Sequence, residues 1–186
     1  MTSLTLWLHK VAKGRVTLLA LVIFVLFSAI VLPAQADRTR QYSGNAGTID
    51  TRFWYSTEEI YHKAESYGKE GRRAYIIERV SFDLIWPLVY AFCLGTTISF
   101  FFQRSFPSGS WMQGMNLVPV IAMLFDLMEN IAASVLMLLY PNELPWLAKI
   151  LPYFTSLKWL LIFGSFILVI VGVGAWVMKK LRKSEK

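Results

Sequence analysis

Four ionisable side chains interrupt apolar runs that are otherwise long enough to cross a membrane. Asp126 and Glu129 lie in one run, Asp83 in an earlier run and Lys158 in a later one. On a helix, Asp126, Glu129 and Asn130 share one face because they are spaced i, i+3, i+4. A charge at the bilayer centre costs about 2.5–3.5 kcal/mol even on insertion scales. This face must therefore meet protein or water rather than lipid.

The depth of these residues predicts which of them meet. Counted from the inner ends of their runs at 1.5 Å per residue, Lys158 lies at about 30 Å, Asp83 at about 28 Å and Glu129 at about 21 Å. We expect these three to form a polar cluster near the outer boundary, with Asn130 as a hydrogen-bonding member. Asp126, at about 16 Å, lies deeper, so Lys158 should reach Glu129 more easily than Asp126.

The expected cluster has three acids and one base. If all were ionised, the net charge would be −2 in a poorly hydrated site, so we expect at least one acid, Asp126 first, to be protonated or to bind an external cation. Three interpretations stay open. The polar side chains hold the helices together, or they form a proton, ion or small-ligand site in a transport protein. Alternatively, they catalyse a reaction on lipid, with Arg72 and Arg73 contacting the headgroup.

The elements that position these residues are predicted to be transmembrane helices. Of the 186 residues, 55 % are hydrophobic and 17 % charged, whereas soluble domains average roughly a quarter charged. We therefore predict an all-α integral membrane protein, a four-helix bundle. The expected spans are 16–33, 80–102, 115–140 and 154–178. The expected connections are 1–15, 34–79, 103–114, 141–153 and the basic tail 179–186.

Lys and Arg positions predict the orientation. The densest cluster of basic residues lies at 179–186, and Lys10, Lys13 and Arg15 precede the first span. Both termini should therefore face the cytoplasm of a prokaryotic inner (plasma) membrane, with 34–79 outside. A second interpretation of the N-terminus stays open, because the apolar run followed by Ala-Gln-Ala at 34–36 also fits a signal peptide of residues 1–36.

The outer segment 34–79 is predicted to be partly helical. Residues 37–51 have the composition of an irregular loop. Ser56 and Glu59 have the spacing of a capping box, which predicts a helix from Thr57 to about Tyr67. A break near Gly68 to Gly71 should precede a second helix that continues into the next span.

Several functions have no support in the sequence. No phosphate-binding loop, nucleophile elbow, metal-ligand motif or haem attachment motif is found, so we expect no cofactor and no metal, and identify no catalytic residue. The positive charge lies at span ends, which argues against a nucleic-acid partner. The expected partners are the lipid bilayer, with anionic headgroups at the tail, and either a second copy or another membrane protein.

One family resemblance covers about residues 53–165. The residues that carry it are Tyr67-Gly68, Gly71-Arg72, Tyr75, 83–90, Asp126-Leu127 and Glu129-Asn130. With these residues the chain resembles an uncharacterised group of small prokaryotic multi-pass membrane proteins. The resemblance implies a multi-pass fold and adds no activity. The function expected from the residues is therefore that of an accessory or interaction protein rather than an enzyme.

Overall fold

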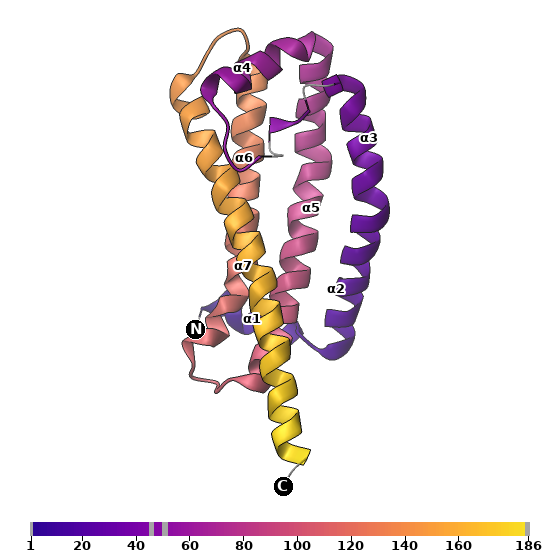
Figure 1. The fold of residues 1–186 in the computed structure, drawn as a ribbon, viewed down its shortest axis with the longest axis vertical. Helices are drawn as coiled ribbons and strands as arrows, with labels where there is room; N and C mark the ends of the chain where they lie inside the picture. Colours follow the sequence, from indigo (N-terminus) through magenta and orange to yellow (C-terminus); the bar gives the residue numbers. More distant parts are fainter. Residues whose placement is uncertain (1, 45–46, 50–51, 185–186) are drawn as a thin grey trace. The chain divides into compact units, whose positions relative to one another are not determined.

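The computed structural model of the chain describes residues 2–44, 47–49 and 52–184. Within these ranges the chain is all-helical, with no β-strand (Figure 1). The elements are α1 (Ser3–Val11), α2 (Gly14–Leu26), the π-helix η1 (Phe27–Val31), α3 (Leu32–Ser43), α4 (Thr57–Ser66), α5 (Gly68–Ser105), the 3₁₀-helix η4 (Trp111–Leu117), α6 (Val118–Leu139) and α7 (Pro145–Ser184).

Among the residues that the structure describes, four helical stretches are long and apolar enough to cross a membrane, as the composition predicts. They are Gly14–Ser43, Gly68–Ser105, Trp111–Leu139 and Pro145–Ser184. The prediction of an all-helical chain with four candidate membrane-spanning helices is confirmed at this level.

The first of these helices is longer than expected. The irregular loop predicted for 37–51 is wrong for its first part, because α3 continues to Ser43 and ends at Gly44, whose φ is +51°. The physical reason lies in tertiary contacts: Thr39 and Tyr42 of α3 hydrogen-bond to Glu78 of α5. Of the remaining residues of that loop, 45–46 and 50–51 lie outside the described residues.

The chain divides into two compact units. Unit 1 comprises Met1–Val25, Val89–Ala122 and Leu160–Lys186, and unit 2 comprises Leu26–Leu88 and Met123–Trp159. The long helices contribute one part to each unit, so each unit is described by itself below.

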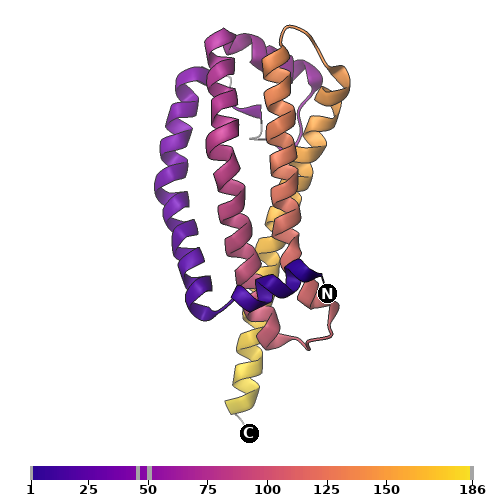
Figure 2. The ribbon, with the colours of Figure 1, turned by 180° about the vertical axis from the view of Figure 1, so that it is seen from behind.

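Unit 1 is built around the contact of α1 with α5 and η4, and Figure 2 shows α1 crossing the end of this part of the chain. The Asn116 side chain donates to the Thr5 carbonyl at 3.3 Å and to the Ser99 hydroxyl at 2.8 Å. Thr5 and Leu8 are almost fully buried. The N-terminal helix is thus an integral part of the unit.

Unit 2 carries the larger apolar core, which is rich in tyrosine. Its buried members come from the segment before α4, from α4 itself and from parts of α5, α6 and α7: Ile49, Tyr55, Ile60, Tyr61, Ala64, Tyr67, Tyr75, Ala132, Ala133, Leu136, Met137, Ala148 and Leu151. α4 lies beside the connection between α6 and α7 (Figure 1). The Tyr61 hydroxyl accepts a hydrogen bond from the Leu144 amide at 2.7 Å, which ties the two together.

The start of α4 is as the sequence predicts, whereas the break after α4 lies earlier than predicted. Ser56 caps α4 at its N-terminus, and the capping box with Glu59 is complete. The helix ends at Ser66, and α5 begins at Gly68, whose φ of +61° is open to glycine without strain. A break is present, but its predicted place is wrong: it lies at Tyr67, and Gly68 to Gly71 form the first turn of α5.

Candidate functional site

The predicted polar face of α6 is buried within unit 2. Asp126, Glu129 and Asn130 are exposed by only 6 %, 2 % and 2 %. Residues on the opposite face, such as Leu124 and Ile131, are more than half exposed. The helical period that places the three polar residues on one side thus turns that side toward the protein and the apolar side outward.

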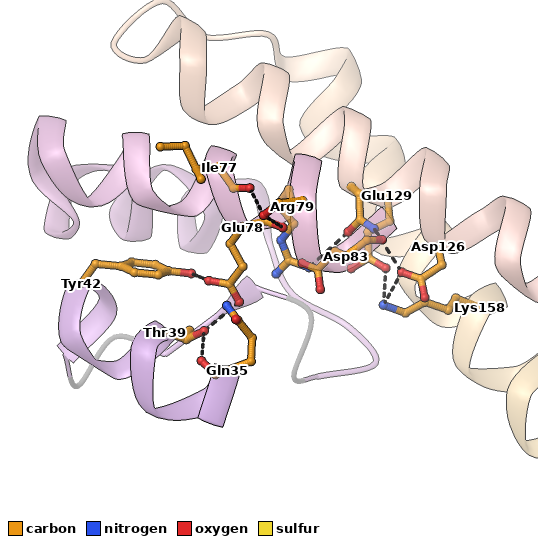
Figure 3. Close-up of polar contacts among 12 residues, drawn as sticks. Gln35, Thr39, Tyr42, Ile77, Glu78, Arg79, Asp83, Asp126, Glu129 and Lys158 are labelled. Atoms are coloured by element: carbon orange, nitrogen blue, oxygen red, sulfur yellow. Dashed lines mark hydrogen bonds and ion pairs between the residues drawn. The ribbon is translucent and has the colours of Figure 1, made fainter. Parts of the chain in front are cut away.

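Lys158 of α7 meets this face, as Figure 3 shows. Its Nζ lies 2.6 Å from Glu129 Oε2 and 3.5 Å from Asp126 Oδ1. The lysine is itself 4 % exposed. The shorter distance is to Glu129, in the order that the depth argument predicts, because Glu129 lies almost one helical turn farther along α6 than Asp126.

Arg79 is a second buried cation, and its role was not anticipated from the sequence. It lies within α5, only 4 % exposed, and its guanidinium NH1 lies 2.9 Å from Asp83 Oδ2. The same nitrogen donates to Asn130 Oδ1 at 3.1 Å, and the guanidinium lies 4.6 Å from the centre of the Tyr75 ring. The expectation that Lys158 alone supplies positive charge is therefore wrong.

The correction changes the charge of the cluster. With Arg79 included, three acids face two bases, and the formal net charge is −1 rather than −2. The signal was present in the sequence, since Arg79 and Asp83 have the i, i+4 spacing of a helical ion pair. It was missed because residue 79 was assigned to the outer segment, whereas α5 runs through it without interruption.

Asn130 connects the two ion pairs. Its Nδ2 donates to the Asp83 carbonyl at 3.0 Å and lies 3.5 Å from Asp126 Oδ1, while its Oδ1 accepts from Arg79. Asp83 joins the cluster through Arg79 and Asn130. We use "polar cluster" below for Arg79, Asp83, Asp126, Glu129, Asn130 and Lys158.

A further polar contact lies on the neighbouring residue of α5. Glu78 Oε1 accepts from the Thr39 hydroxyl at 2.7 Å, and the other carboxylate oxygen accepts from the Tyr42 hydroxyl (Figure 3). These partners are 36 and 39 residues away in the chain. Nothing in the sequence points to this contact, because α3 was expected to end before it.

The two arginines proposed to contact headgroups differ in position. Arg72 NH1 donates to the Ala64 carbonyl at 2.8 Å, and its guanidinium lies 4.7 Å from the centre of the Tyr140 ring. Arg72 is therefore engaged within unit 2, where it fastens α4 to α5. Arg73 is exposed, and a headgroup contact of this residue stays a prediction.

A surface pocket of about 390 Å³ lies beside α4, away from the polar cluster. Its lining residues are Thr57, Glu58, Tyr61, His62, Glu65, Tyr140 and Glu143. Burial raises the pKa of the Tyr61 hydroxyl; the hydrogen bond from the Leu144 amide opposes this rise, and the Glu143 carboxylate adds to it. No group of His, Cys, Asp and Glu is arranged to hold a metal ion in the part of the chain that the structure describes.

Unit 1 contains a smaller polar group that the sequence did not reveal. Gln113 and Asn116 lie i, i+3 on η4, a spacing that aligns side chains on a 3₁₀-helix. The Gln113 side chain donates to the Phe102 and Phe106 carbonyls at 3.1 Å, so it caps the end of α5. The contact of Asn116 with Thr5 and Ser99 then fixes α1 on the same surface.

The polar cluster has two chemical capacities. Its ion pairs and hydrogen bonds join α5, α6 and α7, and its carboxylates are groups able to exchange a proton. Comparison with family models, with curated proteins and with solved structures finds no match to this chain. The case for a function therefore rests on the geometry alone.

Proposed function

We propose that the chain is an accessory or interaction protein of a prokaryotic inner membrane, in which the polar cluster holds the helices of a bundle together. The observation that carries the proposal is the 2.6 Å contact of Lys158 with Glu129 between two nearly fully buried side chains. In such a site each charge is neutralised by a partner side chain of the protein itself. A binding site for an external ion would instead leave carboxylate oxygens facing the ion or water.

The energetics explain why a structural role suits these residues. A buried ion pair adds little net stability over an apolar pair of the same shape, but the loss of one partner costs about 3–5 kcal/mol. A helix pairing that separates the two partners would leave a buried charge unpaired, and it is disfavoured by this free-energy cost. The Lys158–Glu129 ion pair would favour one register of α7 on α6, and the hydrogen bond of Arg79 to Asn130 would favour one register of α5 on α6.

The proposed topology places both termini in the cytoplasm and residues 34–79 outside. It is supported by the concentration of Lys and Arg at 10–15 and 179–186. We also propose that residues 1–36 are retained, because Thr5 and Leu8 of α1 are buried in unit 1. Removal of this segment would expose the Asn116 and Gly95 surfaces that α1 covers.

A double-mutant cycle on the full chain in detergent tests the structural role. The variants are Lys158→Met, Glu129→Gln and the two combined. We expect each single variant to lower the midpoint of thermal unfolding. The combined variant should be more stable than additivity predicts, with a coupling of about 0.5–3 kcal/mol. Single variants as stable as the wild type would contradict a structural role.

A second candidate function, a proton or ion site, is favoured by one observation: the cluster carries one more acid than base. The excess charge is expensive in a buried site, and protonation or a bound cation would remove it. Asp126→Asn distinguishes the two candidates. If this variant keeps its stability but abolishes proton flux into liposomes, the transport function is supported. If it unfolds and wild-type liposomes show no flux, the structural role is supported.

A further inference from the structure

The charge of the protein is divided very unequally between its two units. Unit 1 contains nine of the 19 Lys and Arg residues but only one of the 12 acids, Glu185. Unit 2 contains ten basic residues and eleven acids. Unit 2 is therefore close to neutral, whereas unit 1 holds positive charge that its own carboxylates do not balance.

The basic residues of unit 1 are found at three places along the chain. They follow α1, end α5 and end α7, and all those described are exposed: Lys10, Lys13, Arg15, Arg104, Lys179, Lys180, Arg182 and Lys183. We call this set the basic surface.

Side-chain contacts join the three places. The Gln103 side chain donates to the carbonyl of His9 at 3.2 Å, which fixes α1 next to the end of α5. Lys179 Nζ donates to the Arg104 carbonyl at 2.7 Å, and the Phe101 and Trp176 rings are 5.8 Å apart, which fixes α7 there as well. Both ribbon views place α1 beside this end of α5 (Figures 1 and 2).

Aromatic rings hold two of the cations in place. The Arg104 guanidinium lies 3.6 Å from the centre of the Phe100 ring, and Lys180 Nζ lies 4.9 Å from that of Trp176. Cations stacked on rings lose less conformational freedom when they bind an anion, because the side chain is already ordered. Tryptophan at this position is also typical of the headgroup level of a membrane.

The surface beside these cations is apolar. Leu18, Met178 and Leu181 are each about 60 % exposed within the same unit. A ligand that matches both features has a phosphate group next to hydrocarbon chains. A nucleic acid or an acidic peptide offers the negative charge but not the apolar part.

From this combination we propose that the basic surface binds anionic phospholipid headgroups through their phosphates, with the acyl chains against the adjoining apolar face of unit 1. The binding joins α1, α5 and α7 and is not a property of the C-terminal tail alone. It is independent of the polar cluster of unit 2, so the two proposals fail or succeed separately.

The test uses the full-length protein purified in detergent and stripped of lipid. Phosphatidylglycerol, phosphatidylcholine and inorganic phosphate are added in parallel, and bound lipid is counted by native mass spectrometry. We expect phosphatidylglycerol to bind about tenfold or more tightly than phosphatidylcholine at low salt, and this preference to shrink at high salt because the attraction is screened. Inorganic phosphate should not compete at equal concentration.

Matched variants locate the site. K10Q/K13Q/R15Q and K179Q/K180Q/R182Q/K183Q should each remove most of the preference for phosphatidylglycerol. The control, R38Q/R40Q/K69Q, removes three exposed cations from unit 2 and should keep the preference. Equal binding of the two lipids overturns the proposal. So does competition by inorganic phosphate, which would mark a simple anion site, and so does a K10Q/K13Q/R15Q variant that behaves like the control.

Discussion

Arg79 illustrates how a single residue changes the chemistry of the buried site. With Lys158 alone, the three acids would outnumber their partners by two. Arg79 brings a planar group that reaches Asp83 and Asn130 together, and it stacks on Tyr75. A lysine has one point of charge and lacks this geometry, so it would not replace the arginine. At this scale the identity of the side chain, not only its charge, defines the contact.

Arg79→Met should therefore destabilise unit 2 while leaving its volume nearly unchanged. Loss of the charge-assisted hydrogen bonds to Asp83 and Asn130 should cost about 1.5–3 kcal/mol, measured from thermal or denaturant unfolding in detergent. Arg73→Met is the matched control, since it removes an exposed arginine from the same helix. A midpoint of unfolding equal in the two variants would show that the Arg79 contacts add nothing.

α1 is the element whose packing the sequence predicts least well. It is short, and its sequence fits either a cytoplasmic segment before the first span or the start of a signal peptide. In the structure it becomes part of unit 1 through the Asn116 and Gln103 side chains. His9 lies at this contact, and burial lowers the pKa of its imidazole, while a hydrogen bond with the Gln113 backbone acts in the opposite direction.

The docking of α1 should consequently weaken in acid. Because the folded protein disfavours protonated His9, its contribution to stability is present above the ordinary histidine pKa of about 6.5 and is lost as pH falls below it. Thermal unfolding at pH 7.5 and 5.5 should show a smaller acid loss for His9→Gln than for the wild type. His62→Gln, which changes an exposed histidine on α4, is the control and should retain the full loss.

On the scale of the whole molecule, the distribution of charge links folding to orientation. The nearly neutral unit holds the buried ion pairs and the tyrosine-rich core, and the other unit holds the unbalanced positive charge. Positively charged ends stay in the cytoplasm during insertion. In the proposed orientation the same residues would meet the anionic inner leaflet, and one sequence feature would then serve both proposals, orientation and lipid binding.

Cysteine labelling tests this orientation directly. The only cysteine, Cys93, is buried, so the wild type provides a low background. Thr57→Cys should react with a membrane-impermeant maleimide in intact cells, whereas Ser184→Cys should react only after the inner membrane is opened. Reaction of Ser184→Cys in intact cells would reverse the proposed topology.

Much of this protein followed from local sequence. The apolar runs, the capping box at Ser56 and the one-sided spacing of Asp126, Glu129 and Asn130 predicted helices and a buried polar face, because each is governed by residues within one or two turns. The shorter distance of Lys158 to Glu129 than to Asp126 agrees with the residue count along the helices, which gives the order of the two acids in depth.

Only the tertiary structure decided the rest. The contacts of Glu78 with Thr39 and Tyr42, and of Asn116 with Thr5, join residues 36 to 111 positions apart. Such contacts depend on which helix faces pack together, and this packing is not encoded by any local period. They extend α3 beyond its expected end and bring α1 into unit 1.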